Sequence, residues 1–242
     1  SSSLIPAVNK LGSVPLILGG NQEQKKRWLS ELAKGRGFSY CLSESEAGSD
    51  AAAMKTRAVR DGDSWIINGS KKWISHAGVS DFYTVLASTD PGLRAKGITA
   101  FIVEKSDVGV SFGAHEKKMG FRGSPTREVY FDNVRVGDDR RISDVGAGFA
   151  LAMKTLDHTR ITIAAQALGI AQGALDIATK YAHERHQFGK PIFDFQAVQF
   201  MLADMAMEIA AARQLTYAAA AKSESEAKDL TFFSAASKCF AT

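Results

Sequence analysis

The residues best suited to chemistry lie in one short run, 40–50, which combines hydroxyl groups, carboxylates and a glycine. Its members are Tyr40, Cys41, Leu42, Ser43, Glu44, Ser45, Glu46, Ala47, Gly48, Ser49 and Asp50. The residues before this run follow a helical pattern, and the long stretch after it follows a strand pattern. Where regular pairing ends, backbone N–H groups become free to bind a ligand. The run is therefore the first candidate for a binding site.

Other functions for this run depend on its acidic and hydroxyl side chains. The even spacing of Glu44, Glu46 and Asp50 fits a calcium loop, but Gly48 comes one place early for the sharp turn and no bidentate glutamate closes the loop. A serine nucleophile would need the Gly-x-Ser-x-Gly elbow, which surrounds none of the serines here. A solvated acidic turn without a function stays open from composition alone.

Two further motifs carry groups that could contact a ligand, and each also has a structural explanation. The triplet Trp73-Ile74-Ser75 follows the turn signal Asn68-Gly69, and a lone tryptophan on a strand usually packs in a core. We expect His76 beside it to be a bystander. Asp157 and Arg160 share a helix face at i, i+3, which by itself predicts only a surface ion pair.

A helix C-terminus explains part of the run 183–189. Arg185 there favours the helix dipole and Gly189 ends the helix, but this does not account for Gln187 and Phe188 between them. The two histidines of 183–186 are three positions apart, whereas a His-Glu-x-x-His zinc site needs four. We therefore expect no metal site.

The elements that must position these residues begin with a helical block, 4–34. Asn21 is its predicted N-cap, with Gln24 at the capping-box position. The block 38–140 then holds short strands separated by turn signals, which is typical of an antiparallel barrel or sandwich and not of a doubly wound sheet. The expected strands are 56–60, 65–68, 71–75, 82–88, 98–104, 109–112 and 128–132.

The block 146–242 predicts long helices joined by short loops, which indicates an up-down bundle. The first helix runs from Phe149 to Glu184, the second begins at the cap Asp194, and the third begins at the cap Asp229. We expect an α+β multi-domain protein with a partial N-terminal helical domain (1–37), a middle β domain (38–140) and an incomplete helical bundle domain (141–242). A missing initiator Met and a last helix without a stop signal predict a piece of a longer protein.

Composition limits the possible functions. The 242 residues are 45% hydrophobic and 23% charged, as in a soluble globular protein. A net charge of +4, spread among acidic residues, provides no basic stripe for nucleic acid, although phosphate-bearing small molecules stay possible. Two cysteines form no disulfide framework and suit a reducing compartment. Charges interrupt the apolar runs short of the roughly 20 residues of a membrane span, so we expect none.

Five ordered motifs together resemble the acyl-CoA dehydrogenase family, and the resemblance covers the whole chain. They are Cys41-Leu42-Ser43-Glu44-x-x-Ala47-Gly48-Ser49-Asp50-x-x-Ala53, then 68–75, 120–126, 156–160 and 185–191. The chain is most similar to the bacterial short- and medium-chain-type enzymes. The resemblance implies FAD-dependent α,β-desaturation of a fatty acyl-CoA to the trans-2-enoyl-CoA, as in fatty acid β-oxidation, with electrons passed to an electron-transfer flavoprotein.

The resemblance also implies a flavin site built from several segments. The implied cofactor contacts are Tyr40, Leu42, Ser43, Gly48, Ser49, Trp73, Ile74, Ser75, Arg185, Gln187, Phe188, Phe195 and Gln196, and the implied substrate contacts are Ser49, Asp157 and Arg160. Backbone groups near Ser43 would bind the flavin ring, Trp73 would flank it, and Arg185 would reach the pyrophosphate of a neighbouring protomer. FAD would then lie at the protomer interface of a homodimer or homotetramer. Glu44 and Glu46 are expected to be structural.

A glutamate removes the α-proton in such enzymes, and its position in the sequence varies. In the isovaleryl- and long-chain-type relatives it occupies the place that Thr159 holds here. In the enzymes that this chain most resembles, it lies in a Tyr-Glu-Gly-Thr segment, which the chain does not contain. We therefore expect no catalytic residue within the chain and a base beyond Thr242, so the chain by itself should not turn over substrate.

Two alternative functions stay open. One keeps the fold and changes the oxidant: an acyl-CoA oxidase, a flavin monooxygenase or a nitroalkane oxidase. The other is a non-catalytic binding module that kept the flavin fold. The preferred acyl chain length does not follow from the sequence. The expected location is the cytoplasm of a bacterium, or the mitochondrial matrix should the source be eukaryotic.

Overall fold

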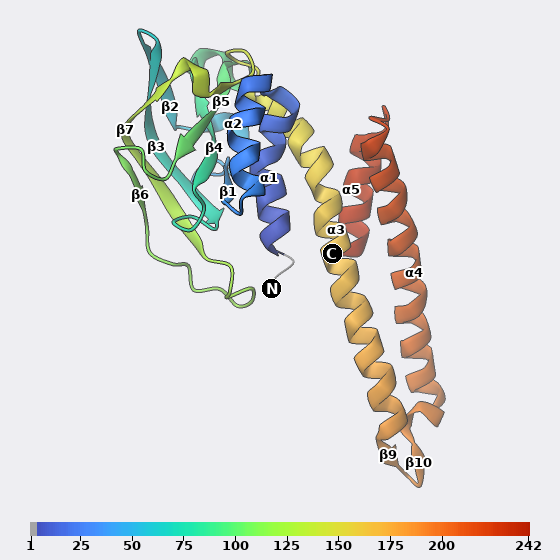
Figure 1. The fold of residues 1–242 in the computed structure, drawn as a ribbon. Coiled ribbons are helices and arrows are strands. Elements are labelled where there is room, and N and C mark those ends of the chain that lie inside the picture. The colour runs from blue at the N-terminus through green and yellow to red at the C-terminus, as the bar shows by residue number, and fades with distance from the viewer. Residues whose placement is uncertain (1–3) are drawn as a thin grey trace. The chain divides into compact units, whose positions relative to one another are not determined.

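The structure, a computed structural model, describes residues 4–242 and confirms an α+β fold (Figure 1). It forms two compact units, the first reaching Leu156 and the second running from Asp157 to Thr242. Helix α3 (Gly148–Glu184) passes from one to the other. Among the described residues, α3 is the one helix that is long and apolar enough to cross a membrane. Core helices of soluble proteins meet the same criteria of length and composition.

The first unit packs two helices against a mixed sheet (Figure 1). The helices are α1 (Leu4–Gly19) and α2 (Gln22–Ala33). The strands are β1 (Phe38–Cys41), β2 (Arg57–Asp61), β3 (Ser64–Ser75), β4 (Phe82–Ser88), β5 (Ile98–Glu104), β6 (Val110–Phe112), β7 (Thr126–Gly137) and β8 (Arg141–Ile142). Their order is β6-β7-β3-β2-β4-β5-β8, with β1 also paired to β4.

The expectation of a wholly antiparallel sheet holds for most strand pairs but is wrong for β4 and two of its neighbours. β1 runs parallel to β4, with Tyr40 opposite Thr84, and β2 meets β4 in parallel at Arg57 and Ser88. Turn signals predict hairpins between strands that follow one another in sequence. They contain no information on β1 and β4, which other elements separate, so only the tertiary structure shows this pairing.

The predicted turn at Asn68-Gly69 is wrong, because β3 runs straight through it. Pairing with β7 shifts register between Ile67 and Gly69, as in a β-bulge. Gly69 adopts φ +142°, and a Cβ there would lie 2.7 Å from the Cα of Thr56. The glycine therefore allows a close approach of two backbones and does not reverse the chain.

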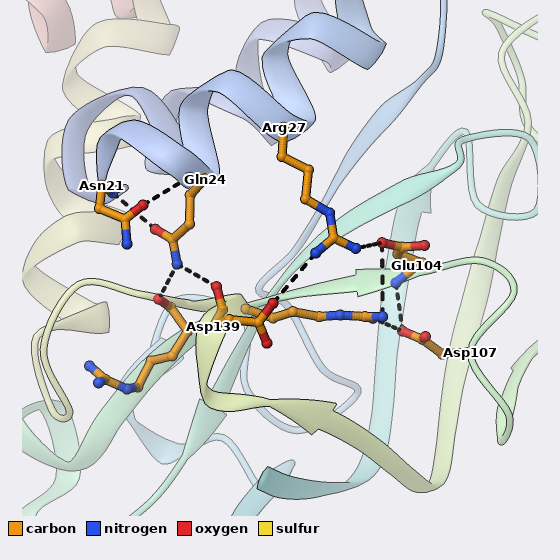
Figure 2. Close-up of polar contacts among 8 residues, drawn as sticks. Asn21, Gln24, Arg27, Glu104, Asp107 and Asp139 are labelled. Carbon is orange, nitrogen blue, oxygen red and sulfur yellow. Dashed lines mark hydrogen bonds and ion pairs between the residues drawn. The ribbon is translucent and has the colours of Figure 1, made fainter. Parts of the chain in front are cut away.

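Helix α2 begins with the predicted capping box, which the structure confirms (Figure 2). The Gln24 backbone N–H donates to the Asn21 side chain over 2.8 Å, and the Asn21 N–H donates to Gln24 Oε1 over 3.0 Å. The Gln24 amide nitrogen also donates to the carbonyls of Asp139 and Arg141, at 2.7 and 2.8 Å. Arg27 adds ion pairs to Glu104 and Asp139. The same glutamine thus begins the helix and holds it against the end of the sheet.

We expect Gln24→Ala to lower the free energy of unfolding by about 2 kcal/mol, since it removes part of a cap and leaves two carbonyls without a donor. Urea unfolding of the variant measures this loss. Glu23→Ala, which changes the neighbouring position without touching these bonds, is the matched control. Equal stability of the two variants would contradict the role given to Gln24.

The second unit is a helical hairpin closed by a third helix. Residues 157–184 of α3 pack against α4 (Gln196–Glu224), and α5 (Leu230–Ala241) packs on α4. The two-residue strands β9 (His186–Gln187) and β10 (Lys190–Pro191) connect α3 to α4. Two small apolar clusters form its core. One centres on Ile161, Ala219 and Leu230. The other centres on Leu168, Ile209 and Ala212. This agrees with the predicted up-down arrangement.

Two predicted helix caps are wrong in detail. Asp194 ends the short turn Ile192–Asp194, and Phe195 occupies the N-cap of α4 without a side-chain bond. Asp229 does stand at the N-cap of α5, but its side chain makes no cap bond there. Its carboxylate binds Lys222 at 2.7 and 2.9 Å, because an ammonium group within reach offers a stronger, charge-assisted bond.

Candidate functional site

Six of the residues implied as flavin contacts line one cavity of about 220 Å³ in the first unit. Its lining consists of Tyr40, Leu42, Ser43, Trp73, Ile74 and Ser75 together with Val8, Leu11, Lys72 and Leu156. The first three lie on β1 and the loop after it, and the next three lie at the end of β3. A backbone hydrogen bond from Lys72 to the Ser43 carbonyl, 2.9 Å long, joins the two segments.

Tyr40 brings an unsatisfied polar group to this cavity. Its ring is buried, and its hydroxyl has no hydrogen-bond partner among the described residues. Burial raises the pKa of this hydroxyl above its ordinary value, so it stays protonated and can donate. Buried polar groups are nearly always paired, so the Tyr40 hydroxyl is one donor in the cavity lining that remains available to a bound group.

Trp73 lies at the surface and not in the core, so the core explanation of this tryptophan is wrong. Its side chain is 58% exposed, whereas Trp28 and Trp65 are 2% and 4% exposed. It adopts φ +63°, a left-handed conformation that is rare for a bulky residue, at a second bulge of β3 between Lys71 and Ile74. Strained residues held in place by their surroundings cluster at ligand sites.

The other two residues of the triplet are held firmly. Ile74 is buried in the core of the sheet. The Ser75 carbonyl accepts a hydrogen bond of 2.7 Å from the Ser39 hydroxyl, which also lies 2.8 Å from the Ser80 hydroxyl. The end of β3 is thus a fixed wall from which Trp73 projects.

A buried ion pair supports the loop after β1. Lys71 is fully buried, and its ammonium group lies 2.8 Å from Glu44 Oε1 and 3.1 Å from the Leu42 carbonyl. Glu44 also accepts backbone N–H bonds from Lys55 at 2.6 Å and Thr56 at 3.0 Å. Glu44 is therefore structural, as expected. Lys71 was not expected, although its even spacing from Trp65 and Ile67 places it on the same inward face.

Burial and pairing act in opposite directions on this ion pair. Burial alone would raise the pKa of Glu44, but the Lys71 charge and the bonds that Glu44 accepts outweigh it and hold the pKa below its ordinary value. Burial lowers the pKa of Lys71, and Glu44 opposes that change. The neighbouring thiol of Cys41 is fully buried, which raises its pKa to about 12 and makes it unreactive.

The structure does not bring every implied contact to the cavity. Gly48 and Ser49 lie on the exposed loop outside its lining, where Asp50 pairs with Arg94 at 3.2 Å. No carboxylate is found among the described residues that line the cavity. Nor do the described residues contain a group of three or more His, Cys, Asp or Glu that could hold a metal ion.

In the second unit, the remaining cofactor candidates gather at the hairpin that joins α3 to α4. Phe188 and Gly189 both have positive φ, +54° and +79°, as a two-residue hairpin turn requires. Phe188 is 91% exposed, and its ring meets Phe195 edge-on at 6.1 Å. Arg185, Gln187 and Gln196 are exposed beside them. The tip therefore presents cationic, amide and aromatic groups at the surface.

Asp157 and Arg160 form the predicted i, i+3 ion pair, 2.7 Å long. Asp157 also accepts a bond of 2.7 Å from the Thr231 hydroxyl, and its carbonyl accepts one from Ser234. These bonds tie α3 to α5, so Asp157 has a structural role. The role of this pair in binding substrate stays a prediction.

Comparisons with known proteins agree with this architecture. Residues 39–134 match the family described as "Acyl-CoA dehydrogenase, middle domain", and residues 146–242 match "Acyl-CoA dehydrogenase, C-terminal domain". The chain is 60% identical, over all of its length, to the probable acyl-CoA dehydrogenase fadE25 of Mycobacterium leprae, and spans 62% of that protein. It is 44% identical to the caffeyl-CoA reductase-Etf complex subunit CarC of Acetobacterium woodii, over 91% of this chain and 58% of that one.

The solved structure of butyryl-CoA dehydrogenase from Megasphaera elsdenii superposes with a TM-score of 0.95, at 41% identity, over 98% of this chain and 63% of that one. The chain belongs to the acyl-CoA dehydrogenase family, whose members are oxidoreductases, and membership implies FAD as the cofactor. The chain spans about three-fifths of the length of these relatives.

Proposed function

We propose that the protein to which this chain belongs catalyses the FAD-dependent α,β-desaturation of a fatty acyl-CoA thioester and passes the electrons to an electron-transfer flavoprotein. The observation that carries this proposal is the convergence of Tyr40–Ser43 and Trp73–Ser75 on one cavity. Family membership narrows the ligand to a flavin. The Acetobacterium woodii relative, a subunit of a caffeyl-CoA reductase-Etf complex, supports this choice of electron acceptor.

The residues of the cavity fit a flavin. The unpaired Tyr40 hydroxyl offers a hydrogen bond, and the exposed Trp73 ring offers a flat face for stacking. The cofactor supplies the oxidising chemistry, since its ring accepts a hydride from the β-carbon. The chain contributes position and polarity: Ser43 places a hydroxyl and backbone groups at the cavity, where donors stabilise developing negative charge.

Apolar side chains on the same wall restrict water. Val8, Leu11 and Leu156 line the cavity beside the polar groups. A dry environment strengthens each hydrogen bond to the reacting groups and prevents side reactions. No carboxylate belongs to this lining, and we propose that the base that takes the α-proton is a glutamate contributed from outside it.

The hairpin at 185–196 supports a proposal on assembly. An arginine fork suits bidentate binding of a pyrophosphate, and the exposed aromatic ring of Phe188 suits contact with a nucleotide base. We propose that Arg185 and Phe188 serve the FAD of a neighbouring protomer in a homodimer or homotetramer. We also propose that the protein is located in the cytoplasm of a bacterium, or in the mitochondrial matrix should the source be a eukaryote.

Flavin spectroscopy of the intact protein tests the proposed function. We expect an absorbance band at about 450 nm that acyl-CoA bleaches without oxygen, as a reduced flavin requires. Reoxidation should be slow in air and fast with electron-transfer flavoprotein. Fast reoxidation in air would favour an oxidase, and a colourless protein that does not bind FAD would contradict the proposal. A series of acyl chain lengths in the same assay defines the preferred substrate.

A further inference from the structure

Lys72 is a cavity residue to which the family motifs assign no role. It lies between Lys71, which is buried in the core, and Trp73, which projects from the bulge of β3. Its side chain is 29% exposed and lines the cavity together with Ser43 and Trp73. Its backbone N–H donates to the Ser43 carbonyl over 2.9 Å, so its main chain is fixed to the opposite wall.

The ammonium group of Lys72 makes two contacts at once. It lies 5.1 Å from the centre of the Trp73 ring, within the range of a cation–π interaction. It also lies 2.9 Å from Glu128 Oε1 on β7. The hydrogen bond with Glu128 raises the pKa of Lys72, so the side chain stays charged. Glu128 is fixed in turn by the hydroxyl of Tyr130.

Trp73 needs such a restraint, because the bulge takes its ring out of the core. A side chain that is 58% exposed gains little order from packing. An unrestrained indole ring would rotate among several rotamers, and a ligand would have to order it on binding at an entropic cost. A cation anchored on a neighbouring strand removes part of that cost in advance.

We propose that Lys72 is a positioning residue: anchored on Glu128, it holds the Trp73 ring over the cavity in the orientation that the flavin meets. This rests on the proposed function for the identity of the ligand, but the restraint on the ring belongs to the chain itself. The flavin-free chain should therefore show it.

Tryptophan fluorescence of the flavin-free chain tests the restraint. Of its three tryptophans, Trp28 and Trp65 are buried, so acrylamide, a neutral quencher, reports mainly on Trp73. We expect Lys72→Met and Glu128→Gln each to increase quenching and to speed the local motion seen in time-resolved anisotropy. Lys72→Arg should behave as wild type, since arginine keeps both contacts. Lys34→Met, which breaks an exposed ion pair with Glu31 away from the cavity, should change nothing.

Titration of the intact protein with FAD then tests the consequence. We expect Lys72→Met and Glu128→Gln to weaken FAD binding about three- to tenfold, with recovery in Lys72→Arg, given the strength of an exposed cation–π contact and ion pair. Unchanged quenching and anisotropy in both variants would overturn the proposal. So would altered ring motion with unchanged FAD affinity. If the intact wild-type protein fails to bind FAD while the ring motions of the chain change as expected, the proposed function fails and the restraint on Trp73 stands.

Discussion

Replacing Lys71 with methionine is expected to lower the free energy of unfolding by about 3 to 5 kcal/mol, one of the largest effects that a single substitution in this chain should have. The variant leaves the Glu44 carboxylate buried without its partner and the Leu42 carbonyl without its donor. Urea unfolding followed by circular dichroism measures the loss. Because many proteins are only about 5 to 15 kcal/mol stable, this loss is a large fraction of the total stability.

Two further variants separate the buried ion pair from ordinary effects of charge removal. Lys34→Met breaks an exposed ion pair of 2.6 Å with Glu31 and should cost less than about 1 kcal/mol. Lys71→Met combined with Glu44→Gln removes both buried charges and should recover part of the stability, because no uncompensated charge is left. If Lys71→Met costs no more than Lys34→Met, the ion pair does not support the loop as we describe.

The pH dependence of this loss has a definite sign. In the wild type the pKa of Glu44 lies below its ordinary value. Glu44 therefore contributes stability in full above its pKa in the unfolded chain, about 4.3. This contribution is lost as the pH falls through the pKa of Glu44 in the folded protein. In Lys71→Met only the two backbone N–H bonds still oppose burial, so we expect the pKa of Glu44 to rise and the variant to gain stability as the pH falls. The difference between the two proteins should therefore narrow toward pH values of about 4.

The second large effect is expected from Trp73→Gly, which should separate ligand binding from folding. Removing the ring deletes one stacking face. Stacking of an aromatic side chain on a flat base is worth about 1 to 3 kcal/mol. FAD should therefore bind about five- to a hundredfold more weakly. Stability should change little or rise by about 1 kcal/mol, because glycine adopts the left-handed conformation without strain. Titration with FAD and urea unfolding measure the two quantities on the same sample.

Trp65→Gly is the matched control for this prediction. Trp65 lies on the same strand but is buried, and its ring nitrogen donates to Asp138 over 2.8 Å. Its removal should cost about 3 to 5 kcal/mol through the cavity left behind. A comparable loss of stability in Trp73→Gly would show that Trp73 packs in the core after all, and unchanged FAD affinity would remove Trp73 from the site.

Several features of the chain could be predicted from the sequence because they depend on local interactions. The sequence predicts both ends of the strands 82–88 and 98–104 correctly. Each strand is a dense run of β-branched and aromatic residues, and turn signals mark where it begins and ends. The capping box of Asn21 and Gln24 was also predicted correctly, because both partners lie within one helical turn. The motif residues of the cavity follow from the family resemblance, whereas the sequence alone leaves the run 40–50 open to a plain acidic turn.

The tertiary structure decided which face each residue of β3 takes. Simple alternation from Trp65 and Ile67 continues inward to Lys71 and would carry Trp73 inward next. The bulge between Lys71 and Ile74 adds one residue, so Ile74 fills the core and Trp73 turns outward over the cavity. A bulge depends on how β3 pairs with β7, which lies far along the sequence, and no local pattern specifies it. Residue types thus determined the chemistry available to this chain, whereas pairing between distant strands determined which side chains face the cavity.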